Sequence, residues 1–216
     1  MTPQPKAILF DLDGTLIDSA PDFFDVINEL RAEAALPTLP HHLIRAQVSN
    51  GGMALTQLTW EIDTDHPEFM AYRHTLLERY LANIGSASGL FDGFADVLAE
   101  LEQRHIAWGI VTNKPRRYTD ALLARLPLHA PLVICPEDVQ HPKPHPEPLL
   151  LAAKQLNVDV RDCWYVGDHV RDINAGNAAN MITIAAAFGY IEPHDDIEQW
   201  QADWIIQHPR ELLVSS

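Results

Sequence analysis

Two aspartates separated by one residue, Asp11 and Asp13, follow a short apolar run near the start of the chain. The run at 7–10 predicts a buried strand, and side chains two residues apart on extended backbone point the same way. Ligands of open α/β sheets lie beyond the carboxyl ends of the strands. Two carboxylates that converge there repel each other unless a cation lies between them. The pair therefore predicts a metal-assisted catalytic site, with Gly14 allowing a tight turn directly afterwards.

Three further groups of reactive side chains follow apolar runs or precede a predicted helix. They are Thr112-Asn113, Lys143, and Asp168 with Asp172. In an open parallel sheet, such positions share one crevice. Carboxylates, a lysine and a hydroxyl suit phosphoryl transfer, in which a carboxylate attacks a phosphate that is already negative. A divalent ion and a fixed cation must cancel that repulsion, and oxygen ligands favour Mg²⁺ over zinc.

The periodicity of apolar residues predicts the elements that position these side chains. From residue 90 onward, predicted helices alternate with short apolar strands. The helices are expected at 94–104, 118–126, 146–156 and 170–179, and the strands at 106–111, 132–134, 163–166, 182–186 and 204–206. Such alternation predicts a parallel sheet with helices on both faces.

An all-helical block interrupts this alternation immediately after the first strand. Its first helix is expected to follow Ser19 as N-cap, and further helices are expected at 41–48, 53–62 and 69–81. The segment Ser49-Asn50-Gly51-Gly52 is either an interhelix turn or, through the N–H groups of Gly51 and Gly52, a contact for substrate. The predicted fold is α/β. A Rossmann-like core is formed by residues 1–17 and 85–216, with an inserted helical cap at 18–84.

The reactive stretches resemble, in order and spacing, the four motifs of the haloacid dehalogenase-like hydrolase superfamily. The stretches are Asp11-Leu12-Asp13-Gly14-Thr15-Leu16, Val111-Thr112-Asn113, Lys143-Pro144, and Gly167-Asp168 with Asp172. The helical block lies where that superfamily inserts its cap. Within it, the chain is most similar to the phosphoglycolate phosphatase group. Residues 108–115, 134–136, 143–149 and 189–191 resemble the N-acetylmuramic acid 6-phosphate phosphatases.

The resemblance implies a role for each residue of the motifs. Asp11 would be the nucleophile that forms an aspartyl-phosphate. Asp13 would protonate the leaving oxygen and later activate water. Lys143 would neutralise charge on the phosphate and on Asp11. Mg²⁺ would be held by Asp11, by the main-chain carbonyl of Asp13 and by Asp168, while Asp172 would orient Lys143 or a metal-bound water.

The remaining candidates concern substrate binding. Thr112 and Asn113 would bind the phosphate, as the resemblance implies. Arg45 and Arg116 are candidates for meeting a substrate carboxylate or sugar, with a plain surface arginine as the alternative at each position. His169 departs from the family pattern, because many relatives carry a second acid or a serine after the motif aspartate.

The implied activity is that of a Mg²⁺-dependent phosphatase acting on a small phosphomonoester, with N-acetylmuramate 6-phosphate and 2-phosphoglycolate as expected substrates. A phosphomutase of the same fold uses the same residues and is the alternative. A receiver-like signalling module also places Asp, Thr and Lys around Mg²⁺, but it has no use for Asp13 or for a cap. Dehalogenases of the superfamily need no metal and lack the second aspartate, so Asp13 and Asp168 weigh against that reaction.

Composition narrows the class of partner. The 216 residues include 30 acidic residues and 15 Lys plus Arg, which gives a net charge of −15. Nucleic acids and anionic membranes require basic patches, so neither is an expected partner. No apolar run reaches the ~18 residues of a membrane span, and the start of the sequence lacks a signal-peptide pattern; a cytoplasmic protein is expected. Cys135 and Cys163 are expected to be core thiols.

Overall fold

The first strand, β1 (Ala7–Phe10), is buried along its whole length in a computed structural model that describes residues 4–214. It lies inside a six-stranded parallel sheet with the order β5-β4-β1-β6-β7-β8. The other strands are β4 (Ala107–Val111), β5 (Val133–Ile134), β6 (Cys163–Gly167), β7 (Ile182–Ala186) and β8 (Trp204–Ile206). The chain first builds outward to β5 and then crosses back to β6. The β1–β6 border is therefore the switch point at which such sheets bind ligands.

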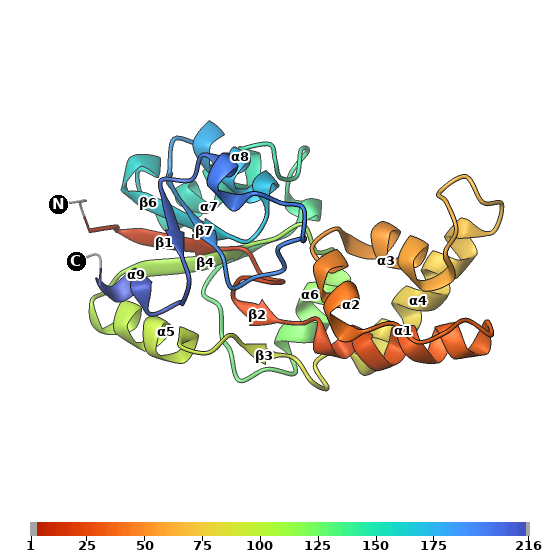
Figure 1. Ribbon diagram of the computed structural model, residues 1–216. Helices are drawn as coiled ribbons and strands as arrows, with labels where there is room; N and C mark the ends of the chain where they lie inside the picture. The colour runs from red at the N-terminus through yellow and green to blue at the C-terminus, as the bar shows by residue number, and fades with distance from the viewer. Residues whose placement is uncertain (1–3, 215–216) are drawn as a thin grey trace.

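Alternate residues of β1 face opposite sides of the sheet and enter different cores. Ile8 and Phe10 pack in the same cluster as Phe94 of α5, whereas Ala7 and Leu9 pack with Leu149 of α7. The core helices are α5 (Phe94–Gln103), α6 (Arg116–Leu123), α7 (Glu147–Leu156), α8 (Val170–Ala178) and α9 (Glu211–Val214), with short 3-10 turns at Pro136–Asp138, Val160–Asp162 and Ile197–Trp200. Figure 1 shows α5 and α9 on one face of the sheet and α7 and α8 on the other. The predicted fold class is confirmed.

Four helices form a cap beside the carboxyl end of the sheet (Figure 1). They are α1 (Pro21–Glu33), α2 (His41–Gln47), α3 (Gly51–Trp60) and α4 (Phe69–Asn83). The chain leaves the core through β2 (Ile17–Asp18) and returns through β3 (Gly89–Leu90), and these two strands pair antiparallel. Because the outgoing and returning strands are bonded to each other, the cap is joined to the core through a double connection.

The buried carboxylate of Asp22 fastens the returning segment to the first turn of α1. It accepts hydrogen bonds from the main-chain N–H of Gly85 at 2.6 Å and of Ala87 at 2.8 Å, and from the hydroxyl of Ser88 at 2.5 Å. The division at 18–84 remains a prediction. Residues 1–3 and 215–216 of the predicted core lie outside the described residues.

Local details differ from the sequence-based prediction at several places, including α6, which spans Arg116–Leu123 rather than 118–126, and the starts of two cap helices. Ser19 is not the N-cap of α1; that position is Ala20, and the helix starts with Pro21, whose missing N–H costs nothing in a first turn. Gly51 and Gly52 open α3 rather than lying in a loop before it. Cys135 and Cys163 are buried free thiols, as predicted. Among the helices of the described part, none has the length and apolar character that crossing a membrane requires.

Candidate active site

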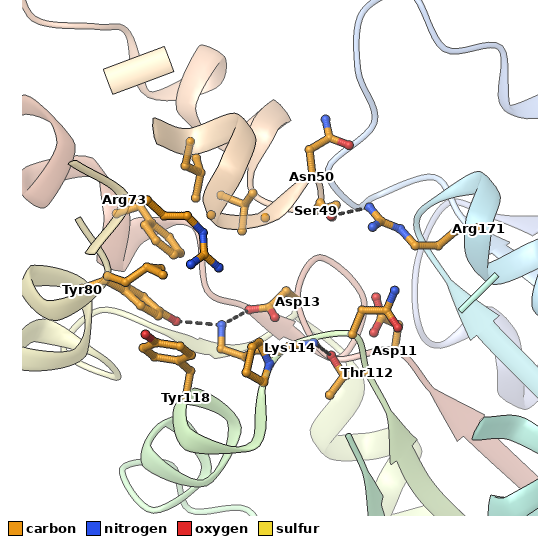
Figure 2. Close-up of a pocket in the computed structure, with 18 residues that line it drawn as sticks. Asp11, Asp13, Ser49, Asn50, Arg73, Tyr80, Thr112, Lys114, Tyr118 and Arg171 are labelled. Atoms are coloured by element: carbon orange, nitrogen blue, oxygen red, sulfur yellow. Dashed lines mark hydrogen bonds and ion pairs between the residues drawn. The ribbon is translucent and has the colours of Figure 1, made fainter. Parts of the chain in front are cut away.

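The reactive side chains come from the carboxyl ends of neighbouring strands. Asp11 follows β1, Thr112 follows β4, and Asp168 follows β6, while Lys143 precedes α7. A cavity of about 330 Å³ lies between these strand ends and the cap, within the size range of small-molecule sites. Its lining includes Asp11, Asp13, Thr112 and Asn113 from the core and Gly51 and Gly52 from the cap. Figure 2 shows Asp11, Asp13 and Thr112 facing the cavity opposite Ser49 and Arg73.

Three buried carboxylates form a cluster at this site. Asp11, Asp168 and Asp172 each place an oxygen within 4.8 Å of the others. Burial raises the pKa of Asp11 to about 6, although Lys143 opposes the shift. Burial, with the charges of Asp11 and Asp172, raises the pKa of Asp168 to about 7. A divalent cation would remove this repulsion, and an all-oxygen donor set suits Mg²⁺.

Three segments hold the carboxylate of Asp168 in place: the turn after β1, the loop after β7 and the turn before α3. Its Oδ1 accepts the hydroxyl of Thr15 at 2.9 Å, and its Oδ2 accepts the N–H of Tyr190 at 2.9 Å and the hydroxyl of Ser49 at 3.1 Å. Gly14 has a φ of +83°, and a Cβ there would lie 2.1 Å from Oδ2 of Asp168. Only glycine permits this turn and this approach together, which explains the glycine after the Asp-x-Asp pair.

Lys143 is the fixed cation of the site. Its Nζ lies 2.8 Å from Oδ1 of Asp11, 2.7 Å from Oδ1 of Asp172 and 2.7 Å from the hydroxyl of Tyr165. Burial lowers the pKa of the ammonium group, but Asp11 and Asp172 outweigh that effect and the pKa is raised. The lysine therefore stays charged beside the carboxylate that would attack phosphate.

Asp172 has both of its oxygens engaged within the described chain. Oδ1 accepts from Lys143, and Oδ2 accepts the N–H of His169 at 3.2 Å. His169 caps α8, with its Nδ1 accepting the N–H of Arg171 at 3.1 Å. The contact that orienting Lys143 would require is thus present, while the role of Asp172 remains a prediction, and the side chain of His169 caps the start of α8.

The side chains of Thr112 and Asn113 have different hydrogen-bond partners. Oγ1 of Thr112 accepts the N–H of Lys114 at 3.0 Å, which leaves its hydroxyl proton available to a phosphate oxygen. The amide of Asn113 instead donates to the carbonyl of Lys143 at 2.8 Å and accepts its N–H at 3.1 Å. The structure therefore gives the Asn113 side chain a positioning job that the sequence analysis did not foresee.

Asp13 is held by residues that the motif comparison did not select. Its Oδ1 accepts the ammonium group of Lys114 at 2.9 Å and the hydroxyl of Ser19. Lys114 also donates to the hydroxyl of Tyr80, on α4, at 2.9 Å. Figure 2 shows this chain from Asp13 through Lys114 to Tyr80 along one side of the cavity. The aspartate predicted to move the proton is therefore linked to the cap.

The two arginines predicted to meet substrate are not brought to the cavity. Arg45 pairs with both oxygens of Asp18 at 2.8 and 2.9 Å, and its guanidinium lies 5.4 Å from the ring centre of Tyr190. Arg116 pairs with the carboxylates of Asp138 and Asp120 on the outside of α6.

The arginines that do line the cavity are Arg73 of α4 and Arg171 of α8. Neither belongs to a motif that sequence reasoning uses. Arg73 shares α4 with Arg79, whereas Arg171 is the one arginine within α8, and only the packing of cap against core shows which way each side chain points. The spacing of the residues carried no signal for either.

Comparisons with known proteins show the family to which the chain belongs. The haloacid dehalogenase-like hydrolase family matches residues 5–180. An N-acetylmuramic acid 6-phosphate phosphatase of Pseudomonas putida is 42% identical over 209 residues, which cover 96% of this chain and 94% of that protein. A phosphoglycolate phosphatase of Xanthomonas campestris pv. campestris is 40% identical over 211 residues, covering 96% and 95%. The crystal structure of a predicted phosphoglycolate phosphatase from Haemophilus somnus matches with a TM-score of 0.85 at 26% identity and covers 100% of both chains.

The family match, the full-length relatives and the buried acidic site agree, and the chain belongs to the haloacid dehalogenase-like hydrolases. Within that family it is a phosphatase, a phosphoric monoester hydrolase. The resemblance drawn from the four motifs is confirmed, including the similarity to the two phosphatase groups.

Proposed function

We propose that this protein is a Mg²⁺-dependent phosphatase of N-acetylmuramate 6-phosphate, with 2-phosphoglycolate as the second candidate substrate. The observation that carries the reaction is the contact of 2.8 Å between Asp11 and the buried ammonium group of Lys143, inside the carboxylate cluster. The order of substrates rests on the relatives, which are 42% and 40% identical over nearly their whole length.

The chemistry proceeds in two displacements at phosphorus. The free oxygen of Asp11 attacks phosphorus, and the bond from phosphorus to the leaving oxygen breaks as Asp13 gives that oxygen a proton. Asp13 then takes a proton from water, which attacks the aspartyl-phosphate, so that inorganic phosphate leaves and Asp11 is regenerated. Lys143 and the Thr112 hydroxyl stabilise the charge on the transferred group.

A metal ion fits beside these residues. Asp11 and Asp168 would hold it, with the main-chain carbonyl of Asp13 completing the protein ligands and Asp172 close by. Mg²⁺, when bound, supplies positive charge between the phosphate and the attacking carboxylate. The raised pKa values of Asp11, about 6, and Asp168, about 7, support this assignment because each carboxylate lacks sufficient counter-charge from the chain alone.

The helical region at 18–84 serves as a cap that encloses the substrate over the core of residues 1–17 and 85–216. Two hydrogen bonds connect core and cap residues that line the cavity. Lys114 of the core donates to Tyr80 of the cap at 2.9 Å, and Arg171 donates to the main-chain carbonyl of Ser49. A closed cap excludes water while the phosphoryl group moves and must reopen to release product.

The test compares kcat/KM for N-acetylmuramate 6-phosphate, 2-phosphoglycolate and p-nitrophenyl phosphate at one Mg²⁺ concentration. We expect one of the two metabolites to exceed the aryl phosphate by at least roughly tenfold, and a chelator to abolish turnover until Mg²⁺ is restored. Release of one phosphate for each substrate consumed separates hydrolysis from a phosphomutase reaction. The substrate assignment is wrong if the aryl phosphate is the best substrate.

The substitution Asp11→Asn tests the nucleophile. It keeps the size of the side chain and removes its nucleophilic charge, so we expect hydrolysis to fall by at least ~1000-fold with the fold retained. Far-ultraviolet circular dichroism and a thermal melt check the fold. Turnover near the wild-type rate contradicts the aspartyl-phosphate route.

A further inference from the structure

Arg73 brings to the cavity wall a charged group that has no partner in the part of the chain that the structure describes. Its Nε is buried and makes no hydrogen bond, and within residues 4–214 we find no hydrogen bond or ion pair for the rest of its guanidinium. The other such buried side-chain atom among the described residues, Oε1 of Glu78, lies 2.9 Å from Nη1 of Arg117 and is neutralised there. A buried donor that lacks a partner is costly, and arginine cannot lose its charge to reduce that cost.

The direction of Arg73 distinguishes it from the other cations at the cavity. Figure 2 shows its guanidinium pointing from α4 into the space above Asp13 and Lys114. Lys114 is paired with Asp13 at 2.9 Å, and Arg171 donates to the main chain of Ser49. Among the described cations that line the cavity, Arg73 alone faces it without a partner.

The start of α3 leaves room for this guanidinium. A Cβ placed on Gly52 would lie 3.5 Å from Nε of Arg73 and 3.3 Å from Cδ2 of Leu77. With glycine at this position, the helix can approach Arg73 closely without covering it with a side chain.

We propose that Arg73 binds a carboxylate of the substrate, at a distance from the phosphate, and thereby selects phosphomonoesters of carboxylic acids. This inference rests on the proposed function. The phosphate end of the site already has Lys143 and the hydroxyl of Thr112, so an additional cation on the cap suits a second anion. The planar guanidinium matches a carboxylate through two parallel hydrogen bonds.

The relatives are consistent with this chemistry. One is an N-acetylmuramic acid 6-phosphate phosphatase and another a phosphoglycolate phosphatase, and both names contain an acid that carries a phosphate. A sugar acid and a two-carbon acid differ greatly in size but share one carboxylate and one phosphate. The shared chemistry, rather than the size, is what a guanidinium recognises.

The experiment measures kcat/KM on two matched pairs of substrates, with and without the carboxylate. N-acetylmuramate 6-phosphate is compared with N-acetylglucosamine 6-phosphate, and 2-phosphoglycolate with 2-hydroxyethyl phosphate. We expect Arg73→Gln to reduce the preference for the carboxylated member of one pair by ~10- to 100-fold, mainly through KM. Arg73→Lys, which keeps the charge without the fork, should reduce it less. The pair that responds identifies whether a sugar acid or a short acid is bound.

Arg79 provides a matched control on the same helix. It is half exposed and pairs with Glu33 at 2.8 Å, outside the cavity, so Arg79→Gln removes the same charge and should leave the preference as in the wild type. The inference is overturned if an Arg73 variant lowers kcat/KM equally for both members of each pair, or if neither Arg73 variant lowers it. Either result leaves the phosphatase activity in place. If the wild type releases phosphate from none of the four compounds, the proposed function fails as well.

Discussion

The side-chain amide of Asn113 brackets the main chain of Lys143. Nδ2 of the asparagine lies 2.8 Å from the lysine carbonyl oxygen, and Oδ1 lies 3.1 Å from the lysine nitrogen. The loop that carries the fixed cation is thus fastened to the residue after Thr112, at the end of β4. The ammonium group of Lys143 is held separately by Asp11 and Asp172. Its position therefore depends on hydrogen bonds at both ends of the residue.

Replacing Asn113 with alanine should lower kcat/KM by ~10- to 100-fold, because small displacements of a positioned group are costly in catalysis. The lysine keeps its charge in this variant but loses the main-chain bracket. Steady-state kinetics at saturating Mg²⁺ measures the effect, which we expect mainly in kcat.

Asn28 offers a matched control, because it brackets the main chain of Leu39 in the same way. Its Nδ2 donates to the Leu39 carbonyl at 3.2 Å, and its Oδ1 accepts the Leu39 N–H at 2.7 Å, in the cap and away from the cavity lining. Asn28→Ala should lower the free energy of unfolding by ~1–3 kcal/mol, similar to the effect of Asn113→Ala. It should not lower kcat/KM. Equal kinetic effects from the two variants would show that Asn113 acts only through stability.

The response to Mg²⁺ should depend on pH. The pKa of Asp11 is raised to about 6 and that of Asp168 to about 7, so the metal-free folded protein binds more protons than the unfolded chain between pH 4 and these values. Its stability therefore falls as the pH rises through this window. Mg²⁺ at the proposed site would bind the ionised carboxylates, which are the destabilised form. We expect the rise in melting temperature on adding Mg²⁺ to be larger at pH 8 than at pH 5.5.

Thermal melts at both pH values, at matched ionic strength, measure this difference. Asp168→Asn removes one of the two raised carboxyl groups and a proposed metal ligand, so it should shrink the rise at pH 8 toward the value at pH 5.5. An increase of the same size at both pH values in the wild type contradicts metal binding at these carboxylates.

Much of the core site could be predicted because parallel strands deliver their carboxyl ends to one edge of the sheet. Asp11, Thr112 and Asp168 each follow an apolar run, so their meeting needed only the sheet order. Lys114 was not predicted to take part, although it directly follows Asn113. Its contact with Asp13 is completed by Tyr80, and the sequence does not show how α4 of the cap docks on the core.

The arginines show the same limit on what a sequence determines. Arg45 and Arg73 both lie on amphipathic cap helices, and no spacing rule separates them. Asp18 at the exit from the core neutralises Arg45, whereas no carboxylate within the described residues pairs with the guanidinium of Arg73. That difference comes from the packing of the helices, which fixes the neighbours of each side chain.

The link from Asp13 through Lys114 to Tyr80 should matter for the proton-transfer step. Lys114→Met removes the ammonium group but keeps a long apolar side chain. Of the two described hydrogen bonds to Oδ1 of Asp13, the one from the Ser19 hydroxyl then remains. We expect kcat to fall by ~10- to 100-fold as the carboxylate loses its fixed position. An activated aryl phosphate has a good leaving group, which needs less help from a general acid. Steady-state kinetics with such a substrate therefore helps to assign the effect of Lys114→Met to the proton-transfer step.

Tyr80→Phe is the milder test of the same link. It removes only the hydroxyl that accepts from Lys114 at 2.9 Å and leaves the ring stacked on Phe23 at 3.9 Å between centres. The loss in kcat should be smaller than for Lys114→Met, at roughly threefold, since one hydrogen bond to a charged group is removed. A wild-type kcat for Lys114→Met on the natural substrate excludes the lysine from the reaction.

The two glycines that open α3 should respond differently to alanine. Gly51 has a φ of +76°, and no atom of the described residues apart from the adjoining chain lies within 4 Å of the position of a Cβ, so Gly51→Ala introduces only backbone strain, at roughly 1–2 kcal/mol in the free energy of unfolding. At Gly52 the new methyl group would lie 3.3 Å from Leu77 and 3.5 Å from Nε of Arg73, so both side chains must shift.

We therefore expect Gly52→Ala to raise KM by ~3- to 10-fold, since groups displaced at a binding site lose part of their interaction, with a smaller loss of stability than Gly51→Ala. Chemical denaturation and steady-state kinetics on both variants measure the two effects independently. The glycines lie side by side at the start of one helix, so a general disturbance of α3 would change KM in both. A rise in KM confined to Gly52→Ala would identify the methyl group's contact with the cavity wall as the cause, because Gly51→Ala places nothing against that wall.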